Sequence, residues 1–441
     1  SQVQYQQSLN DVWGWADPVT GVEYAIVGTQ TGTSIVSLAD PANATEVLFI
    51  PGPQSTWRDI KAWGNHVYVT NETDNGLLVV DMSGHPNNIT WYEWEPMLED
   101  INGETKQLDA CHNLYIDEFG WCYLVGCNFN NGGAMFIDVF SNPGFPEFVG
   151  YGVPVYAHDA FVRDNIYYAS EIFAGNLTMY DVTDKQNVQT LASQQTPFAF
   201  THNAWLSDDS QTVFTTDEQA NAPVAAYDIS DLSDIKELDQ YVPIETLGDG
   251  VIPHNVHVWQ DWLIISYYTD GGIIVDASKP DNLIEVGNFD TFFGGGQGFS
   301  GAWGAYPFLP SGLVLVSDIG NGLYVLEANY VRACWLEGIV TSSESGNPIP
   351  GAKITIESSQ PNLGNTDING KYATGQAIPG DFNVLFEAAG YFPKTVQATL
   401  ENGVLTELNV ELDPLPNIDI TGTVVRSSDG TPIPNASVFV S

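Results

Sequence analysis

Short runs of alternating apolar and polar residues, separated by polar turns, fill the first 330 residues of the chain. Seven of these runs open with a polar pair or a weaker copy of it: residues 10–15, 58–63, 112–116, 158–162, 202–206, 254–258 and 300–305. Alternation of this kind predicts half-buried β-strands. Recurrence at a spacing of roughly 40 to 50 residues is typical of β-propellers.

Each of the seven repeats continues with further apolar runs. The second run can pair back on the first as a hairpin. The third ends in Asp and a polar turn, as in GLLVVDMSG, and the fourth closes the repeat, as in FPEFVGYG. Four antiparallel strands in each repeat predict an all-β fold, with a seven-bladed β-propeller over residues 1–330. The seventh repeat lacks a clear fourth strand, so we expect the alternating stretch 2–7 to supply it and close the ring.

The third run of each repeat resembles the LVIVD repeat, as GLLVVDMSG and GIIVDASKP illustrate. The succession of seven such units resembles the choice-of-anchor B family of bacterial surface proteins. This resemblance implies an exported protein that a C-terminal anchor holds at the cell surface. It implies no particular activity.

Residues 333–413 follow a different pattern. The phrases PIPGA, DINGKY and AAGY resemble the carboxypeptidase regulatory-like domain, and the resemblance implies a transthyretin-like β-sandwich. We interpret residues 414–419 as a linker and residues 420–441 as the start of a second, truncated module of the same kind. Sandwiches of this type suit the role of a spacer between a head and an anchor.

One turn of this module contains Asp367, Asn369 and Gly370. Their oxygens could hold a calcium ion. This spacing alone supplies few ligands, and a simple Asx turn uses the same residues. We favour the turn, with calcium as the alternative.

The chain has 55 acidic and 12 basic residues and a net charge of -43. Such a surface repels phosphate backbones, so we exclude nucleic acid as a partner. Salt shortens the reach of this charge, which favours a saline exterior and a marine bacterium as the source. Hydrophobic residues make up 43% of the chain, which indicates a folded protein.

The two ends of the chain bear on localisation. No run of about 20 apolar residues occurs, so we expect no direct insertion into a membrane. The start lacks the basic and apolar regions of a secretory signal and is interpreted as a mature N-terminus. The end stops inside a pattern that has just begun, so we expect an anchor or sorting domain beyond Ser441. We therefore expect a secreted protein at the cell surface.

The four cysteines form no CxxC pair, which argues against zinc-ribbon and redox motifs. Cys111 and Cys127 flank a predicted hairpin whose midpoint lies near residues 118–120. They should therefore be cross-strand neighbours. A disulfide and two buried thiols both fit this placement.

The candidate chemistry lies where the innermost strands begin, because these strands line the channel of a propeller. Seven residues take the first position: Asn10, Arg58, His112, His158, His202, His254 and Ser300. The ends of the second strands bring further groups to the same side: Glu72, Glu171, Asp217, Glu218, Tyr267 and Asp318. Imidazoles and carboxylates that converge can bind a divalent metal or share protons.

We therefore predict His112, His158, His202 and His254 as candidate metal ligands. Zn²⁺ and Mn²⁺ suit this set, and Ca²⁺ is a further candidate cofactor. Additional ligand-binding candidates are Arg58, Glu171 and Glu218.

A purely structural role for the histidines is the main alternative. A histidine repeated in several blades can tie the start of its strand to a neighbouring loop by a hydrogen bond. The residues that follow them, Asn113, Asp159, Asn203 and Asn255, should face away from the channel by strand alternation.

Other signals for function are weak. The chain contains no G-x-S-x-G elbow, P-loop, dinucleotide fingerprint or H-E-x-x-H motif. The glycine-rich stretch 290–304 is interpreted as a connection at the channel mouth. Exposed aromatic residues could stack on sugar rings, although packing between blades explains them equally well: Phe292, Phe293, Phe299, Trp91 and Trp94.

Three functions remain in view. We favour a binding or adhesion head on a stalk, with a surface glycan or a protein as its ligand. The first alternative is a secreted propeller enzyme, a hydrolase or polysaccharide lyase, that uses the histidine cluster with or without a metal. The second is a structural subunit of a surface appendage. A propeller fold does not decide among them.

Overall fold

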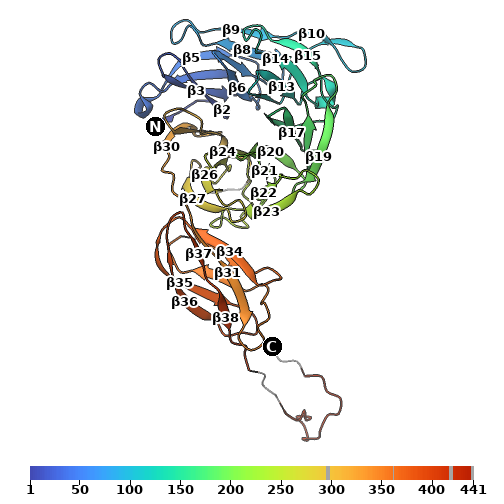
Figure 1. The fold of residues 1–441 in the computed structure, drawn as a ribbon, viewed down its shortest axis with the longest axis vertical. Helices are drawn as coiled ribbons and strands as arrows, with labels where there is room; N and C mark the ends of the chain where they lie inside the picture. Colours follow the sequence, from blue (N-terminus) through green and yellow to red (C-terminus); the bar gives the residue numbers. More distant parts are fainter. Residues whose placement is uncertain (295–297, 361, 417–420, 439–441) are drawn as a thin grey trace.

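The computed structural model describes residues 1–294, 298–360, 362–416 and 421–438. Strands dominate it. The described residues contain two three-residue 3-10 turns, η1 (Pro41–Asn43) and η2 (Asn130–Gly132), and no α-helix. This confirms the all-β prediction. Figure 1 shows a ring of sheets with a smaller β-sandwich beside it.

Seven four-stranded antiparallel sheets follow one another within the first 330 residues, as far as the chain is described. The first sheet contains β2 (Leu9–Ala16), β3 (Glu23–Thr29), β4 (Gly32–Ser37) and β5 (Thr45–Pro51). The second contains β6 (Ile60–Trp63), β7 (His66–Val69), β8 (Leu77–Asp81) and β9 (Thr90–Trp94). The third contains β12 (Asn113–Ile116), β13 (Trp121–Val125), β14 (Met135–Asp138) and β15 (Glu147–Tyr151). A short hairpin of β10 (Met97–Glu99) and β11 (Thr105–Gln107) precedes the third sheet.

The remaining four sheets repeat this order. The fourth contains β16 (Asp159–Arg163), β17 (Ile166–Glu171), β18 (Asn176–Asp181) and β19 (Gln189–Gln195). The fifth contains β20 (Thr201–Leu206), β21 (Thr212–Asp217), β22 (Val224–Asp228) and β23 (Lys236–Tyr241). The sixth contains β24 (Asn255–Trp259), β25 (Trp262–Ser266), β26 (Gly272–Asp276) and β27 (Ile284–Phe289). The last contains β28 (Ala302–Tyr306), β29 (Leu313–Asp318), β30 (Gly322–Glu327) and, at its outer edge, β1 (Gln2–Val3).

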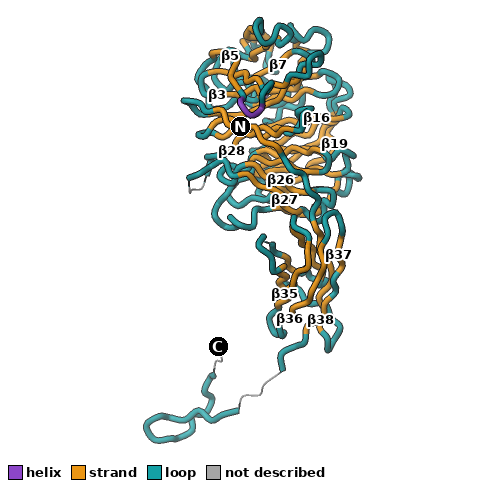
Figure 2. Tube along the Cα trace, turned by 90° about the vertical axis from the view of Figure 1, so that its left-hand side faces the viewer, coloured by secondary structure: helices purple, strands orange, loops and turns teal. Residues whose placement is uncertain are grey.

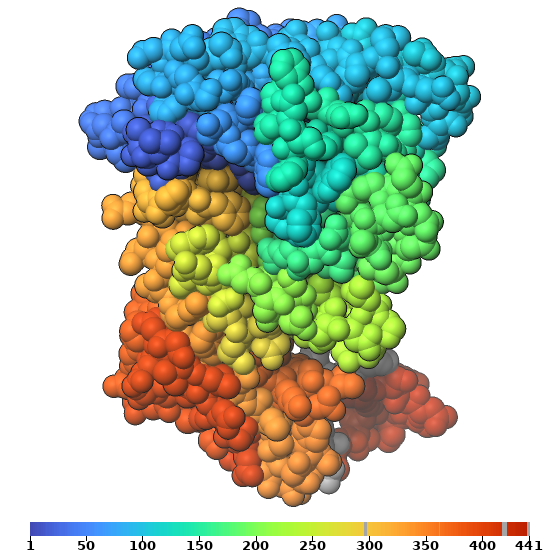
Figure 3. Space-filling model, turned by 45° about the horizontal axis from the view of Figure 1, so that its top comes forward, coloured from blue at the N-terminus to red at the C-terminus, as the bar shows by residue number. Residues whose placement is uncertain are grey.

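The first strands of the sheets contact one another in a closed cycle. β2 contacts β6, and the contacts continue through β12, β16, β20 and β24 to β28, which contacts β2 again. The innermost strands therefore surround one axis, as they do in a β-propeller. Figure 3 shows the blue N-terminal residues beside the orange segment that ends the ring.

The N-terminal strand joins the two ends of the ring. β1 pairs antiparallel with β30. The Ser1 ammonium group donates to the Val325 carbonyl over 2.7 Å, and the Val325 amide donates to the Ser1 carbonyl over 2.8 Å. The predicted closing strand is confirmed in its pairing, although it contains two residues and not the whole stretch 2–7.

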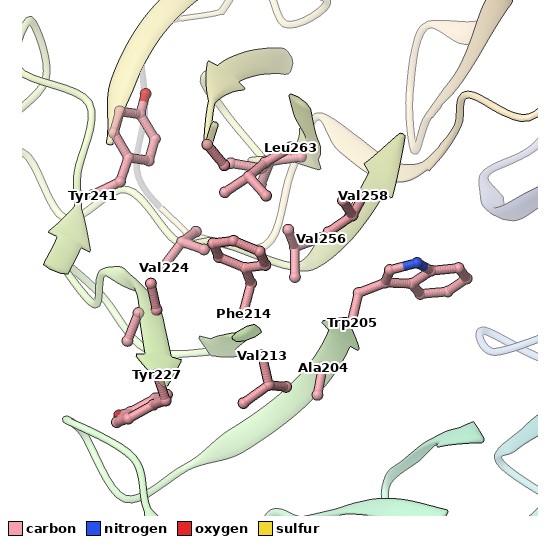
Figure 4. Close-up of a cluster of buried hydrophobic side chains, with 14 of the residues drawn as sticks. Ala204, Trp205, Val213, Phe214, Val224, Tyr227, Tyr241, Val256, Val258 and Leu263 are labelled. Carbon is pink, nitrogen blue, oxygen red and sulfur yellow. The ribbon is translucent and has the colours of Figure 1, made fainter. Parts of the chain in front are cut away.

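Apolar side chains fill the space between neighbouring sheets. In the cluster between the fifth and sixth sheets, Phe214, Val224, Val256 and Leu263 point toward one another (Figure 4) and are almost fully buried. Both faces of a blade are covered by its neighbours, so β21 is buried at all six positions. Simple alternation is therefore blurred in the middle strands.

A Cys111–Cys127 disulfide joins the segment before β12 to the segment after β13 in the third sheet. The His112 amide donates to the Val125 carbonyl over 3.1 Å, so the two cysteines flank β12 and β13 as cross-strand neighbours. The other two cysteines, Cys122 and Cys334, are buried thiols.

The second part of the chain is a two-sheet β-sandwich. One sheet contains β31 (Cys334–Ser342), β34 (Lys371–Gln376), β37 (Leu405–Glu407) and β38 (Val410–Leu412). The other contains β32 (Lys353–Ile356), β33 (Gly364–Asn365), β35 (Gly380–Glu387) and β36 (Lys394–Leu400). Leu336, Ile354 and Phe386 are fully buried between the sheets. The Asp367 side chain accepts the backbone amides of Asn369 and Lys371, each over 2.8 Å, which is an Asx-type turn.

Hydrogen bonds join the sandwich to the sixth sheet. The fully buried Asp276 accepts from the Arg332 guanidinium over 2.9 Å and from the Ala333 amide over 2.8 Å. The Trp335 indole donates to the Asn282 carbonyl over 3.1 Å. Figure 2 shows the sandwich strands continuing directly from the ring.

The predicted second module is only partly described. Residues 417–420 and 439–441, which include half of the proposed linker, lie outside the described residues. Between residues 421 and 438 the structure has one bridge, Val425 to Pro432, and no longer strand.

No helix among the described residues is long and apolar enough to span a membrane.

Candidate metal centre in the channel mouth

Four histidines from neighbouring sheets meet at one mouth of the channel. The ring centroids lie 3.8 Å apart for His112 and His158, 4.5 Å for His158 and His202, and 4.4 Å for His202 and His254. The Nε2 atoms of His112 and His158 are 2.9 Å apart. The structure thus brings together the four histidines that sequence analysis selected.

Three of these imidazoles are oriented by a hydrogen bond at Nδ1. His112 Nδ1 lies 2.5 Å from Glu72 Oε1. His202 Nδ1 lies 3.1 Å from the His254 carbonyl, and His254 Nδ1 lies 2.5 Å from the Trp303 carbonyl. A carbonyl needs a donor, so His202 and His254 carry a proton on Nδ1 when neutral and keep the Nε2 lone pair free for a ligand.

Glu218 adds a carboxylate to this cluster. Its oxygens lie 3.8 Å from His202 Nε2 and 3.9 Å from His254 Nε2. Ligand atoms of His158, His202 and Glu218 all lie within 4.8 Å of one another. The Tyr268 hydroxyl donates to Glu218 Oε1 over 2.6 Å and so holds the carboxylate toward the imidazoles.

Three of the four histidines, His158, His202 and His254, are held in the neutral form that metals require. Burial, and after it the neighbouring imidazoles, push the pKa of His158 and of His254 well below the ordinary value. Burial also lowers the pKa of His202, although Glu218 opposes this shift. A neutral imidazole with a free Nε2 is the ligand form for Zn²⁺ and related ions.

A ring of carboxylates lies one step deeper in the channel. Burial and, second, the Asp59 carboxylate raise the pKa of Asp159 to about 7 and raise that of Asp11 as well. The Lys61 ammonium group lies 2.8 Å from Asp59 Oδ2. Three buried carboxylates thus face one ammonium group. The raised pKa values mean that protons offset part of this buried charge, and a cation bound here would compete with those protons.

The residues that directly follow the four histidines correct one prediction. Asn113, Asp159 and Asn255 line the cavity together with the histidines, and Asn203 Nδ2 donates to Asp159 Oδ2 over 3.1 Å. They were expected to face away from the channel. That prediction was wrong. β12, β16 and β24 begin at Asn113, Asp159 and Asn255, so the preceding histidines lie outside the strands and do not follow the alternation of side chains. In β20, a register shift between Thr201 and Asn203 has the same effect.

The cavity between the two rings is small and polar. Its volume is about 50 Å³, which is room for an ion and a few waters, since one water needs roughly 10–15 Å³. Asn113 Oδ1 and Asn255 Oδ1 are buried and have no hydrogen-bond partner among the described residues. A cation or its bound water would satisfy these oxygens.

Aromatic side chains close the channel beneath the carboxylates. Trp205 packs on Phe161 and on His257 with ring centroids 4.6 Å apart in both pairs, and Trp13 lies 4.7 Å from Tyr306. The Lys61 ammonium group lies 4.5 Å from the centroid of the Trp13 ring. These rings fill the channel beneath the carboxylates, and we call the part of the channel on the histidine side the funnel.

Arg58 and Glu171, the other ligand-binding candidates, have polar atoms engaged within the protein. Arg58 lines the cavity, but its guanidinium donates to the carbonyls of Thr29, over 2.8 Å, and Pro53, so its donors are largely occupied. Glu171 points into its own sheet, where it accepts from Thr178 over 2.8 Å and from Tyr180 over 2.6 Å. Its place at the end of β17 did not reveal which face its side chain takes.

The last repeat presents Trp303 to the cluster, and not the predicted Ser300. A Ser or Thr of one sheet donates to the carbonyl of the first-position residue in the next sheet, as Thr216 does to His254 over 2.6 Å and Ser266 does to Trp303 over 2.7 Å. This shared bond marks Trp303 as the counterpart of the histidines. The loop before β28 is longer than the repeat pattern suggested, which shifted the predicted register.

The other second-strand ends serve local structure. Asp217 accepts the amides of Phe198 and Phe200, Asp318 accepts those of Gly320 and Asn321, and Tyr267 donates to the Ala222 carbonyl. Of the six predicted residues, Glu72 and Glu218 contact the imidazoles. Tyr268 was missed, although it directly follows the predicted Tyr267.

The fold and the site define a β-propeller whose channel mouth carries a candidate metal centre, joined to a β-sandwich. Residues 336–413 match the carboxypeptidase regulatory-like domain, and residues 56–88 and 254–291 match the LVIVD repeat. These matches confirm the resemblances to the LVIVD repeat and to the carboxypeptidase regulatory-like domain. The second LVIVD match begins at His254, a member of the imidazole cluster.

No curated protein matches the chain. Similar solved structures include the β-propeller domain of Cps50 (Swd1) from Myceliophteria thermophila, at 9% identity and a TM-score of 0.49, over 75% of this chain and 99% of that chain. Another is the periplasmic gluconolactonase of Pseudomonas aeruginosa, at 13% identity and a TM-score of 0.49, over 73% of this chain and 92% of that chain. At these identities we infer nothing about activity from either protein.

Proposed function

We propose that the seven sheets are the blades of a seven-bladed propeller that acts as an exported, metal-dependent binding head on a β-sandwich spacer. The observation that carries this proposal is the convergence of His158, His202 and Glu218, whose ligand atoms lie within 4.8 Å of one another. His112 and His254 flank this set and supply further Nε2 atoms.

The donor set favours a transition-metal ion over calcium. Imidazole and carboxylate together suit Zn²⁺, Mn²⁺ and iron, whereas calcium prefers oxygen ligands alone. Three ligands that share one ion at bonds of about 2.0–2.2 Å lie about 3.3–3.8 Å apart in trigonal or tetrahedral geometry. The side chains therefore close by up to about 1 Å when the ion binds.

Two properties of the chain support export to the cell surface. Disulfides persist in oxidising compartments, and the chain contains the Cys111–Cys127 disulfide. The net charge of -43 is least costly in saline surroundings. An anchored surface protein of the choice-of-anchor B type fits both properties. A secreted enzyme and an appendage subunit gain no specific support of their own.

Metal binding to the full chain tests this proposal. We expect protein stripped with EDTA to bind Zn²⁺ or Mn²⁺ at one site per chain in calorimetry. The double variant His158→Ala/His202→Ala should weaken binding by at least about 100-fold, since it removes two ligands. His66 lies outside the funnel, so His66→Ala is the matched control. Equal affinities of the double variant and the control would contradict the proposal.

A further inference from the structure

A larger hollow opens beside the metal cavity and shares part of its wall. We call it the vestibule. Its volume is about 440 Å³, and it shares Trp57, Glu218 and Trp303 with the cavity. A molecule in the vestibule therefore contacts the same carboxylate that faces the proposed metal ion. The cavity of about 50 Å³ admits no organic ring, so an organic ligand must bind in the vestibule.

Aromatic side chains form much of this wall. Trp57 is 42% exposed and Phe299 is 61% exposed, while Tyr268 and Trp303 lie deeper. The rings of Tyr268 and Phe299 are perpendicular, with centroids 5.5 Å apart. Large aromatic side chains normally gain stability by burial. Here two of them leave much of their surface open at the edge of a hollow, which suits a ligand with an apolar face.

Apart from Leu9 and Ile319, the rest of the lining is polar, and it carries no positive charge. Gln30, Ser55, Thr56 and Asn10 provide amide and hydroxyl groups, and Glu218 is the one charged residue among the described lining residues. No lysine or arginine lines the vestibule, and the whole chain carries a net charge of -43. Apart from the proposed ion, an anionic ligand would meet no cation here, and a purely apolar ligand would leave the amides and hydroxyls unpaired.

We propose that the vestibule binds one neutral sugar residue at the end of a glycan. A pyranose ring has an apolar C–H face, which would pack on Trp57 or Trp303. Its hydroxyls would donate to Glu218 and bond with the amides of the wall. The vestibule volume lies in the range of small-molecule sites. This inference rests on the proposed function, because the ion beside Glu218 would also meet the sugar hydroxyls.

Saturation-transfer NMR on the zinc-loaded full chain tests the inference. The probes are the methyl glycosides of glucose, galactose, mannose, fucose and N-acetylglucosamine, with methyl glucuronide as an anionic comparison. We expect at least one neutral glycoside to bind, and the glucuronide to bind more weakly. Trp57→Ala and Phe299→Ala should each weaken the affinity for the neutral glycoside by at least about fivefold.

The control is Trp91→Ala, because Trp91 is similarly exposed, at 44%, but lies on β9 outside the vestibule. This variant should bind the glycoside as the wild type does. Absence of any neutral glycoside signal, tighter binding of the glucuronide, or equal affinities of Trp57→Ala, Phe299→Ala and the control would each overturn the inference.

A metal titration of the same samples separates the two proposals. Metal binding without glycoside binding would overturn the sugar site and leave the metal site standing. Glycoside binding that survives EDTA and depends on Trp57 would support the aromatic wall while contradicting a role for the ion. Loss of glycoside binding in EDTA and its return with Zn²⁺ is the expected result.

Discussion

The Tyr268 hydroxyl donates to Glu218 over 2.6 Å and holds that carboxylate between His202 and His254. Tyr268 is fully buried and has a backbone φ of 25°, in a region that residues other than glycine seldom adopt. Strain of this kind persists where surrounding contacts hold it, as at binding sites. The bonds to Gly271 and Ala302 keep the Tyr268 backbone in place. Tyr268 is thus a positioning residue for Glu218.

The first prediction concerns this pair. Tyr268→Phe keeps the ring but removes the hydrogen bond, so the carboxylate loses its orientation and Zn²⁺ affinity should fall about 10-fold. Tyr151, whose hydroxyl donates to the Glu99 carbonyl far from the funnel, provides the control Tyr151→Phe. Calorimetric Kd values should separate the two variants while their thermal midpoints stay similar. Unchanged Zn²⁺ affinity in Tyr268→Phe would exclude a positioning role.

The second prediction concerns the Cys111–Cys127 disulfide, which spans 16 residues of sequence. A disulfide that closes a loop of that length stabilises the folded state by about 3 kcal/mol, because it restricts the unfolded chain. We expect Cys111→Ser/Cys127→Ser to lower the free energy of unfolding by about 2–4 kcal/mol. Because Cys111 directly precedes His112, metal affinity should fall as well. Urea unfolding and zinc titration check both effects, and wild-type protein treated with a reductant should behave like the variant.

The third prediction concerns the pH dependence of stability. Burial lowers the pKa of His257 to about 3, and the ring lies among Trp13, Trp205 and Phe308. The same residue in the unfolded chain titrates near its ordinary value of about 6.5. Between these two values the unfolded chain binds a proton that the folded chain does not. The stability from neutral His257 is therefore present above pH 6.5 and is lost as pH falls toward 3.

His257→Phe should remove this contribution. In urea unfolding at pH 7.5, 6 and 5, the variant should lose less stability than the wild type below pH 6.5. The difference in slope should be at most about 1.4 kcal/mol per pH unit, the value for one proton. Parallel pH profiles for the two proteins would show that His257 does not titrate in this way.

The fourth prediction concerns closure of the ring. Deletion of residues 1–3 removes β1 and leaves the edge of β30 unpaired. An open edge strand favours association with other chains. We expect a lower thermal midpoint and concentration-dependent light scattering. Val3→Ile keeps the backbone pairing and the Gln2 side-chain bonds to Asn321 and Tyr324, so it should behave as the wild type, and a fully monomeric deletion variant would show that β1 is dispensable.

Much of the site was accessible from the sequence because the repeat is local. The recurring polar pair identified His112, His158, His202 and His254, and the cyclic arrangement of the first strands brings them together at the channel mouth. Glu218 was found because it follows the second strand of its repeat. The same reasoning placed Glu171 in the funnel, yet its side chain turns to Tyr180, and strand position alone does not decide that orientation.

Contacts from other repeats decide where a strand begins, and so which of its side chains face the channel. Whether Ser300 or Trp303 joins the imidazoles depends on the bond from Ser266, a residue of the preceding sheet. Whether Asp159 faces the channel depends on where the antiparallel pairing of β16 with β17 begins. Both are long-range effects that alternation cannot show, since a shift of one residue reverses every side chain.

The sequence by itself determined the all-β class, the repeated four-stranded pattern, the sandwich module and the four histidines, because each depends on periodicity or on a local motif. The tertiary structure alone decided that Asp11, Asp59 and Asp159 lie beneath the histidines, that Trp13 and Trp205 close the channel, and that Trp57 faces the vestibule. These relationships join residues far apart in the chain. Their electrostatic and packing energies arise only when the sheets close around a common axis.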